Sequence, residues 1–548
     1  MNIRRIIYLG LFPLLLVGCS ESVDLSINLV NPCDRVVLGQ IGCQYVQVVV
    51  SSLDPNDPLH PGNTDYGPLR TTCEAGSGQC QINAGDLLGP ARVVDVRCMQ
   101  ADQTTVIGRA TSGSLLFATQ AGGVAGLTLN LVMGPVNGLV NTTVLSQDDS
   151  LGDCSALQQS GGRYGHASVV LDDGRVLITG GIRRLGPSVE EILKTAEIFD
   201  PATGKHRLLT RSDGTPVLMQ SPSGRAFHTA TLLRDGRVLL AGGIGMMTEG
   251  TSEVKKALQH SEIFDPRTES FTGTAVMGTG RAHHAATMLA TGEVLLSGGA
   301  AYVSGQVGSY YNTALVYDPV SNTWPEAKRN LPMSTARAFH KAEALDSSSY
   351  GGKVIVIGGE NETGPVNTID IYNPQTGGFL GAIACGGGGQ PGPCMSKSRS
   401  RFCAVRLQDG RIAVAGGITE KNGQPDITME VYNPVPPTGT SLPGRFESLS
   451  SMTVARESPT CSLLDTGNIL IAGGLTAGGP TSVVDVVQVF PDSLNAVAGP
   501  ESLNPPRWMH TANVLRNGWV FLSGGLPSQD AGANALNGSV LFVPPPSF

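Results

Sequence analysis

The sequence predicts an all-β protein, a seven-bladed β-propeller preceded by a small β-sandwich-like module. A string that begins with Arg and ends in Gly-Gly occurs seven times, at spacings of 51 to 62 residues, the period of a propeller blade rather than of a helical solenoid. The apolar runs within it are short, rich in Val, Ile and Leu, and bounded by turn residues. Charged residues make up only 15% of the chain and there are 71 glycines in 548 residues, a balance typical of many short strands and turns.

The first half of each repeat predicts a hairpin. In "RAFHTATLLRDGRVLLAGG" an apolar run, an Asp-Gly turn and a second apolar run follow Arg225 and end at Gly-Gly. We expect strand A, a tight turn and strand B, with the Gly pair where two backbones approach closely. We call the arginines that begin these strings the head arginines: Arg163, Arg225, Arg281, Arg337, Arg399, Arg456 and Arg507.

The second half of each repeat predicts strands C and D. After a variable stretch comes an apolar strand with an aromatic residue before a Pro turn, as in "AEIFDPATG" and "ALVYDPVSN". One four-stranded meander cannot bury both faces, so the units must stack radially and close into a ring. In the last two units we assign the aromatic to Phe490 and Phe542. The final unit ends soon after strand C, so we expect residues 143–159 to supply its fourth strand as a clasp.

The Gly-Gly pair, the Tyr or Phe of strand C and the Asp/Asn-Pro turn resemble the kelch repeat, over residues 142–548. Trp324 is the one clear match to the Trp usual on strand D. The pattern is similar to the propeller of the galactose-oxidase superfamily, and the resemblance implies that strand A lines the central channel. It does not imply activity, since galactose oxidase takes a copper ligand from a domain after the propeller, and we expect no such domain here because the sequence ends at Phe548.

The N-terminus carries a targeting signal. Two arginines precede a short apolar run and the string Leu-Val-Gly-Cys, which resembles the bacterial lipobox. We expect residues 1–18 to be a lipoprotein signal peptide and Cys19 to carry acyl chains that anchor the protein in the cell envelope. Ser20 favours the outer membrane. Residues 19–141 are then the β-sandwich-like module and residues 142–548 the propeller.

Ten cysteines besides Cys19 suit an oxidising compartment. The most local pairs are the expected disulfides, with a further tie possible between Cys98 and Cys154, whereas Cys403 and Cys461 lie in apolar strand runs and are expected as buried free thiols. The expected disulfides are Cys385 with Cys394, Cys33 with Cys43, and Cys73 with Cys80.

The loop-bearing face is the candidate binding surface. In a meander the B–C and D–A connections share one face, and here they are long and unlike each other, as binding loops usually are. In the B–C loops of blades two and three, residues 244–261 and 300–313, we single out Tyr302, Tyr310 and Tyr311 as contact aromatics or as loop packing. The head arginines begin strand A and are expected to rim this face near the channel mouth. They either pair with acids or await an anionic or carbohydrate ligand; the expected acids are Glu197, Glu262, Asp370 and Glu430.

Other chemistry is weakly indicated. The repeated histidines come from different blades, too far apart for a zinc site, and are interpreted as structural: His166, His228, His284, His340 and His510. Residues 54–65 gather carboxylates but lack the spacing of a calcium loop. No protease, phosphate-loop or hydrolase motif is present, so we predict no cofactor, no metal and no catalytic residue.

The formal net charge of −8 argues against a nucleic-acid partner, which requires a basic face. The sequence therefore predicts a membrane-anchored binding or scaffolding protein whose partner is a protein or a glycan. The alternative is a carbohydrate-active or oxidase-like enzyme with its site on the loop-bearing face. Titratable residues converging at the channel mouth with shifted pKa values would favour the enzyme.

Overall fold

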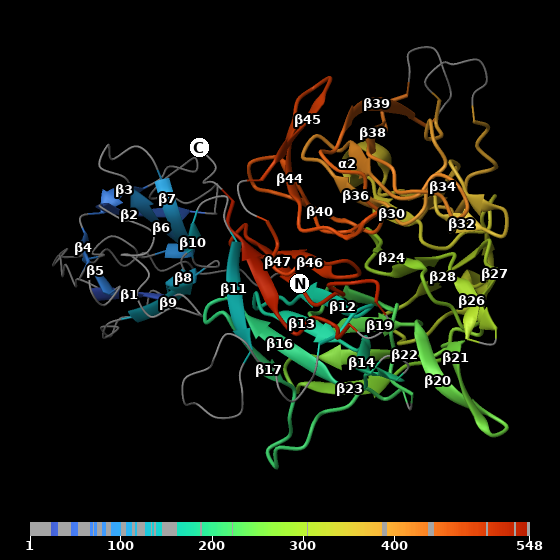
Figure 1. Cartoon of the computed structure of the whole chain (residues 1–548), viewed down its shortest axis with the longest axis horizontal. Coiled ribbons are helices and arrows are strands. Elements are labelled where there is room, and N and C mark those ends of the chain that lie inside the picture. Colours follow the sequence, from blue (N-terminus) through green and yellow to red (C-terminus); the bar gives the residue numbers. More distant parts are fainter. Residues whose placement is uncertain are drawn as a thin grey trace, which may run out of the picture.

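The structure is a computed structural model of the chain (Figure 1). It describes residues 162–544, except 187–188, 222, 304, 386–391, 437–442, 500–501 and 531–532, together with the strands that lie between residues 24 and 144. Cys19, Cys33, Cys43, Cys154 and residues 54–65 lie outside the described part, so the predictions made for them stay predictions.

The strands that precede the propeller form two sheets. The first has the order β4-β5-β1-β9, and the second has the order β10-β7-β6-β2-β3 with β8 added to β6. The apolar runs "YVQVVVSSL", "ARVVDVRCM" and "LTLNLVM" contain β2, most of β6 and β9. The strands are β1 (Asp24–Val30), β2 (Tyr45–Ser52), β3 (Tyr66–Leu69), β4 (Thr71–Cys73), β5 (Gln79–Asn83), β6 (Gly89–Met99), β7 (Val106–Thr111), β8 (Leu115–Phe117), β9 (Leu127–Val132) and β10 (Gly134–Pro135).

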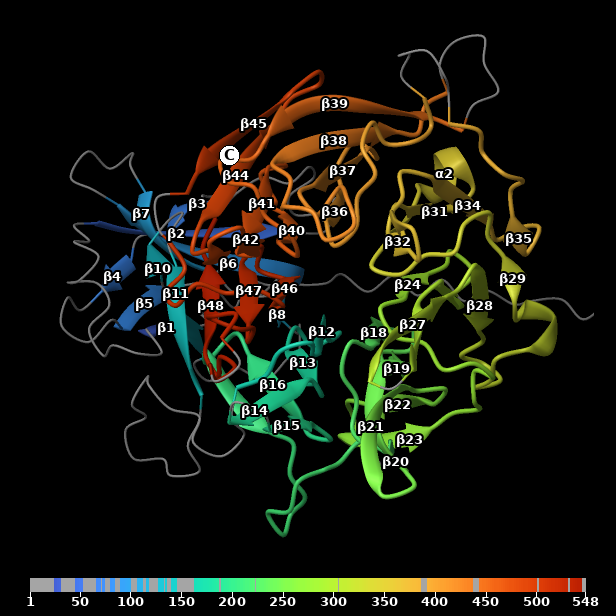
Figure 2. The ribbon, with the colours of Figure 1, turned by 45° about the vertical axis from the view of Figure 1, so that its right-hand side comes forward.

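Seven four-stranded antiparallel blades follow, arranged in a ring (Figure 2). The predicted seven-bladed propeller is thereby confirmed. Blades one to three are β12 (Ala167–Val170), β13 (Val176–Thr179), β16 (Ala196–Asp200) and β17 (Lys205–Leu208); β18 (Thr229–Leu232), β19 (Val238–Ala241), β22 (Ser261–Asp265) and β23 (Ser270–Gly273); and β24 (Ala285–Met288), β25 (Val294–Ser297), β28 (Thr313–Tyr317) and β29 (Leu331–Pro332).

Blades four to six are β30 (Lys341–Ala344), β31 (Val354–Ile357), β34 (Ile369–Asn373) and β35 (Gly378–Phe379); β36 (Cys403–Arg406), β37 (Ile412–Ala415), β38 (Thr428–Asn433) and β39 (Arg445–Ser451); and β40 (Thr460–Leu463), β41 (Ile469–Ala472), β44 (Val484–Val489) and β45 (Leu494–Ala498). Blade seven is β46 (Thr511–Val514), β47 (Val520–Ser523), β48 (Ser539–Phe542) and β11 (Leu139–Val144).

The core lies between neighbouring blades. Strand B is fully buried in every blade, because its apolar side chains pack on blades to both sides. One hydrophobic cluster fills each of the seven blade interfaces, including the one that joins blade seven to blade one. At that closing interface the rings of Phe199 and Phe521 stack with their centroids 4.1 Å apart. The sheets therefore cannot be stable singly.

A clasp closes the ring, as the missing fourth strand required, but the segment differs from the expected one. β11 pairs antiparallel with β48 of blade seven and, at Thr143 and Val144, parallel with β17 of blade one. The strand is Leu139–Val144, which overlaps the expected residues 143–159 only at Thr143 and Val144; its first four residues, Leu139 to Thr142, pair with β48. β11 begins three residues after β10 ends, so it lies between the module and the propeller in Figure 1.

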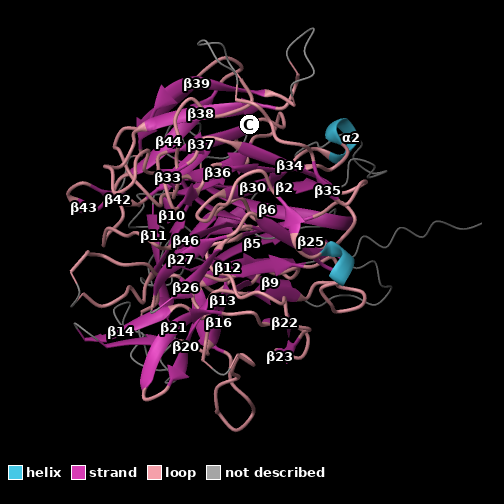
Figure 3. Cartoon of the chain, turned by 90° about the vertical axis from the view of Figure 1, so that its right-hand side faces the viewer, coloured by secondary structure: helices cyan, strands magenta, loops and turns pink. Residues whose placement is uncertain are grey.

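Most of the B–C connections, which were expected to be long and unlike each other, contain β-hairpins. They are β14 (Ile182–Gly186) with β15 (Val189–Ile192), β20 (Ile244–Glu249) with β21 (Ser252–Ala257), β26 (Ala300–Val303) with β27 (Gln306–Tyr310), β32 (Glu360–Asn361) with β33 (Gly364–Pro365), and β42 (Leu475–Thr476) with β43 (Gly479–Pro480). In Figure 3 β14, β33 and β43 lie at one face, and the short helix α2 (Ser347–Tyr350) of an A–B turn lies at the other. A 3-10 turn, η1 (Glu326–Lys328), precedes β29. Across the described residues, no helix has the length and apolar character that crossing a bilayer requires.

Candidate functional site

The head arginines do not rim the channel mouth. All seven are between 0% and 5% exposed, and the Nη1 atom of each donates to the carbonyl of the first Gly in the Gly-Gly pair of its own blade, at 2.7 to 3.3 Å. The second Gly then donates its N–H to the head carbonyl of the next blade; Gly243 donates to Arg281 at 2.9 Å. This contact excludes a side chain, since a Cβ on Gly242 would lie 2.4 Å from the Arg281 carbonyl oxygen. The opening string of each repeat is a structural unit.

Five head arginines pair with buried carboxylates of strand C. The four predicted acids do so: Arg163 with Glu197, Arg225 with Glu262 at 2.6 Å, Arg337 with Asp370 at 2.7 Å, and Arg399 with Glu430 at 2.6 Å. The fifth, Arg456 with Asp485 at 2.9 Å, was missed. Its strand had been aligned on Phe490, which is 45% exposed, whereas the register places Val487 at the aromatic position and Asp485 two residues before it.

Arg281 and Arg507 have apolar residues, Leu315 and Val540, at the position of the acid. Burial lowers the pKa of each of these two guanidinium groups to about 10. The Tyr311 ring stacks on Arg281, 5.1 Å from the guanidinium carbon, and its hydroxyl donates to the Gly280 carbonyl. Tyr311 is therefore packing rather than a contact aromatic.

The repeated histidines join neighbouring blades. Each of the five has its Nε2 within 2.8 to 3.0 Å of a Thr or Ser hydroxyl on the preceding blade, as His228 does with Thr179 and His284 with Thr229. Their rings also lie against the first Gly of that blade's Gly-Gly pair. Burial lowers the pKa of His166 and His284 to about 3, so they are neutral hydrogen-bonding groups.

The channel mouth is formed by the residue two positions after each head arginine. We call this set the mouth ring: Gly165, Phe227, His283, Phe339, Arg401, Ser458 and Met509. All seven have φ between 50° and 61°, a left-handed backbone that is rare for side chains of this size. Six N–H groups of the ring donate to the carbonyl of the previous member, as Phe227 does to Gly165 at 2.7 Å. These inter-blade bonds hold the unfavourable backbone in place.

Half of the mouth ring carries a continuous stack of side chains. The His283 ring lies between Phe227 and Phe339, with centroids 4.6 and 4.0 Å away, and the Arg401 guanidinium lies 4.7 Å from the centroid of Phe339. The Tyr302 hydroxyl contacts His283 Nε2 at 2.7 Å. Burial lowers the pKa of His283 to about 3 and raises that of Tyr302 to about 12, so both are neutral near pH 7. The mouth thus has an aromatic wall.

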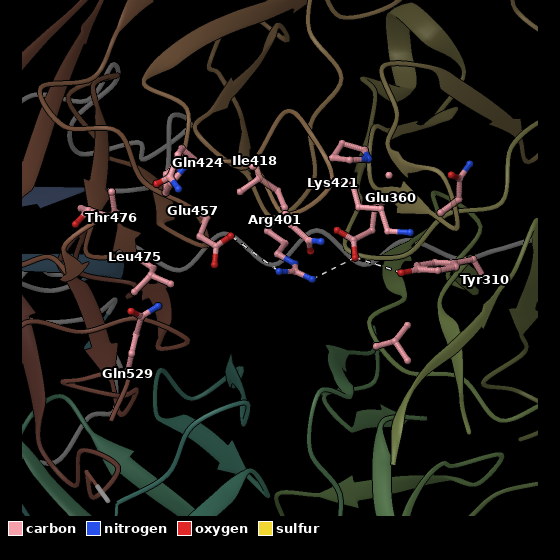
Figure 4. Close-up of a pocket in the computed structure, with 18 residues that line it drawn as sticks. Tyr310, Glu360, Arg401, Ile418, Lys421, Gln424, Glu457, Leu475, Thr476 and Gln529 are labelled. Carbon is pink, nitrogen blue, oxygen red and sulfur yellow. Dashed lines mark hydrogen bonds and ion pairs between the residues drawn. The ribbon is translucent and has the colours of Figure 1, made fainter. Parts of the chain in front are cut away.

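Beside the stack lies the outer basin, a depression of about 490 Å³ bounded by Tyr310, Glu360, Arg401, Lys421 and Glu457 (Figure 4). Arg401 reaches Glu360 at 3.2 Å on one side and Glu457 at 4.0 Å on the other. The Tyr310 hydroxyl donates to Glu360 at 3.3 Å. Three blades supply this chain of charges, and Arg401 remains 35% exposed.

Electrostatics in the outer basin are strongly coupled. Burial, with Glu360 nearby, raises the pKa of the Glu457 carboxyl, although Arg401 opposes the shift. Burial and the Glu360 carboxylate raise the pKa of Tyr310 to about 12. Glu457 is therefore more easily protonated than an ordinary glutamate, while Tyr310 stays a neutral hydrogen-bond donor.

A second hollow, the inner cavity, continues from the outer basin into the channel. Its volume is about 640 Å³, and Arg401, Glu457 and Gln529 line both hollows. Its walls are the mouth ring, Tyr302 and Trp508. Of the three tyrosines singled out from the sequence, Tyr302 and Tyr310 thus line hollows at the mouth.

The structure contains the predicted Cys385–Cys394 disulfide. It also joins Cys403 to Cys461, which were expected to be free thiols. These cysteines lie on the innermost strands of blades five and six, with Cα atoms 5.6 Å apart, a separation that radial stacking creates and the sequence does not show. Cys73 and Cys80 face each other in the register of β4 and β5, and their bond stays a prediction. Cys98 is disulfide-bonded, and its pairing with Cys154 is untested.

The sequence reasoning missed the mouth ring, but a signal for it was present. Within the Arg-x-x-His strings the Arg recurs seven times and the His five times, whereas the residue between them that forms the ring changes chemistry in nearly every blade. When one position varies in an otherwise constant repeat, the fold does not require a particular side chain there. Among the described residues no three His, Cys, Asp or Glu side chains are grouped as a metal site would need.

Comparison with known proteins agrees with this geometry. The kelch motif matches residues 163–211 and 347–377. The chain is a seven-bladed propeller that carries kelch motifs. Kelch-like protein 15 of Danio rerio is 30% identical over 174 residues, and Kelch-like protein 36 of Bos taurus is 29% identical over 208 residues. These kelch alignments cover 30% and 36% of this chain but only 26% and 30% of the relatives.

A solved structure also shares the kelch propeller fold. A fungal alcohol oxidase of the AA5 family, solved in complex with copper, aligns with 70% of this chain and 75% of its own, with a TM-score of 0.50 and 15% identity. At this identity the likeness shows the fold alone.

Proposed function

We propose that this chain is a lipid-anchored protein of the bacterial cell envelope, in the outer membrane, that binds a macromolecular partner, a protein or a glycan, through the outer basin of its kelch propeller. The lipobox-like string ending at Cys19 supports the anchor. The convergence of Glu360, Arg401 and Glu457 supports the binding site.

These three charges are exceptions to the repeat. The residue after each Gly-Gly pair is Ile, Leu or Ala in six blades and Glu360 in one. The residue after each head arginine is charged only at Glu457, and the mouth ring carries a permanent charge only at Arg401. Since the other blades close the ring without such charges, the fold does not require them. Their meeting in one cluster from three blades, where Arg401 is 35% exposed between two buried glutamates, is the observation on which the proposal rests.

Photo-crosslinking in living cells tests the proposal. A photoreactive residue at Lys421, on the rim of the outer basin, is expected to label a partner protein, and the same residue at Lys205, on β17 of blade one, is the matched control. Arg401→Gln should abolish the label from position 421. Equal labelling from both positions, or labelling that survives Arg401→Gln, contradicts the proposed site. If no protein is labelled, Arg401-dependent binding to purified envelope glycans is the remaining outcome that supports it.

An enzyme on the same face is the second candidate, because titratable groups converge there with shifted pKa values. Among the carboxyl groups of the outer basin, Glu457 has a raised pKa, mainly because of burial, and this favours the protonated form that a general acid needs. A turnover assay on envelope sugars with the wild type and Glu457→Gln tests it: activity that Glu457→Gln abolishes favours the enzyme, and equal turnover in both excludes a role for Glu457.

A further inference from the structure

Lys341 is an exception at another position of the repeat. The fourth residue after each head arginine lies at the start of the innermost strand, and six of the seven are small. The set is Ala167, Thr229, Ala285, Lys341, Cys403, Thr460 and Thr511. Although it stands on an innermost strand, Lys341 is exposed, and it lines the inner cavity. Its side chain therefore faces the channel.

The Lys341 ammonium has no hydrogen bond or ion pair with the described residues. Glu343, two residues along β30 and so on the same side of the strand, acts on it only through space. Burial lowers the pKa of Lys341, which shows that its surroundings disfavour the charge. The other blades fill this position with a small side chain, so packing does not need a lysine. Because Lys341 is exposed to the channel and its ammonium has no hydrogen bond or ion pair with the described residues, the cation is available to an anionic ligand.

The rest of the inner cavity defines the shape and charge of that ligand. The stacking covers both faces of His283 and of Phe339, so a ligand ring would meet this wall at ring edges, one of the preferred geometries of aromatic pairs. Trp508 and Gln529 are among the other lining residues. Glu457, which lines the inner cavity, and Glu343, which acts on Lys341 through space, would repel a second negative charge. A volume of about 640 Å³ is of the size that takes a small molecule.

We propose that the inner cavity binds a small organic monoanion, a carboxylate carried on a ring, with the carboxylate on Lys341 and the ring on the aromatic wall. The inference goes beyond the proposed function. It concerns a different hollow and stands whether or not the outer basin binds a macromolecule.

Fluorescence of the full chain tests the inference, because the three tryptophans differ in position. Trp508 lines the inner cavity, whereas Trp324 and Trp519 are each 1% exposed. Benzoate and glucuronate serve as ring carboxylates, benzamide as the neutral match of benzoate, and inorganic phosphate as the dianion, with calorimetry as a second readout. We expect at least one ring carboxylate to give a saturable response, with a dissociation constant of about 1 mM or lower. Benzamide should give none.

Variants of Lys341 test whether its ammonium binds the carboxylate. Lys341→Met should weaken carboxylate binding about tenfold or more, the effect expected when one partly desolvated charge pair is lost. Lys341→Thr, which copies blades two, six and seven, should do the same and is compatible with the fold. Lys341→Arg should retain binding, and Lys205→Met on β17 of blade one, which lines neither hollow, is the matched control that should leave it unchanged.

Several results would overturn the inference. These are benzamide binding as tightly as benzoate, phosphate binding more tightly than both carboxylates, unchanged affinity in folded Lys341→Thr, or no saturable response to either carboxylate. If the wild-type chain binds no carboxylate but shows Arg401-dependent crosslinking, this inference alone is refuted. If it binds a carboxylate through Lys341 but shows no Arg401-dependent binding of a macromolecule, the proposed function alone is refuted.

Discussion

The buried pair of Arg225 and Glu262 allows a quantitative test of how the blades are held together. Arg225 is 0% exposed, and its Nε and Nη2 donate to one Glu262 oxygen at 2.9 and 2.6 Å. Arg225→Met leaves that carboxylate buried without its cation. Breaking a buried pair in this way costs about 3–5 kcal/mol. We therefore expect the free energy of unfolding of Arg225→Met to fall by that amount.

The chain supplies its own reference for this prediction. Arg281 has no carboxylate, so Arg281→Met removes only the hydrogen bonds to the Gly298 and Thr313 carbonyls, at 2.7 and 3.0 Å, and the stack on Tyr311. We expect a loss of about 1–3 kcal/mol. The double variant Arg225→Met with Glu262→Leu also removes the unpaired carboxylate and places there the residue that blade three has at this position, Leu315. It should therefore be more stable than Arg225→Met alone.

Urea unfolding followed by tryptophan fluorescence is the assay, since all three tryptophans lie in the propeller and report on it alone. Refutation is simple to recognise. If Arg225→Met is no less stable than Arg281→Met, or if adding Glu262→Leu brings no recovery, the carboxylate is not held by its arginine in the way the geometry indicates.

Three further predictions concern acid, closure and the anchor. Burial lowers the pKa of six histidines, to about 3 for His166, His283 and His284 and well below the usual value for His228, His340 and His510. When the pH is lowered below about 6.5, the histidines of the unfolded chain take up protons and those of the folded chain do not. The free energy of unfolding therefore decreases by about 1.4 kcal/mol per histidine for each pH unit below that value. Urea midpoints at pH 7.5 and 5.5 measure this, and equal midpoints would contradict it. A truncated chain that begins at residue 162 lacks β11 and should aggregate. A chain that begins at residue 134 keeps β11 and should stay soluble, with a single unfolding transition in calorimetry. If the shorter chain is also soluble and unfolds cooperatively, β11 is not the clasp. Cys19→Ser should move the protein from the membrane to the soluble fraction and end incorporation of radiolabelled palmitate, while Cys403→Ser should leave its fractionation unchanged; membrane association in Cys19→Ser would disprove the lipid anchor.

Local chemistry was enough to predict the blades. The Asp-Gly turns, the Gly-Gly pairs and the apolar runs are short-range signals, and their recurrence gives the ring because an isolated meander cannot bury its faces. The pairing of Arg225 with Glu262 was also within reach, since both residues recur at constant places in the repeat. Blade six lacks the Asp/Asn-Pro turn that marks the aromatic position of strand C. The sequence therefore placed that position at Phe490, three residues after Val487, and Asp485 was not recognised as the acid.

The sequence by itself determined the repeating scaffold, because each blade repeats the same strands, turns and Gly-Gly pair. Only the tertiary structure decided where the exceptions meet. Glu360, Arg401 and Glu457 lie 41 and 56 residues apart along the chain, yet radial stacking puts both carboxylates within 4.0 Å of the Arg401 guanidinium at the mouth. The same stacking joins Cys403 to Cys461 and turns Lys341 toward the channel. Spacing along a chain does not reveal such meetings, because proximity across blades depends on closure of the whole ring.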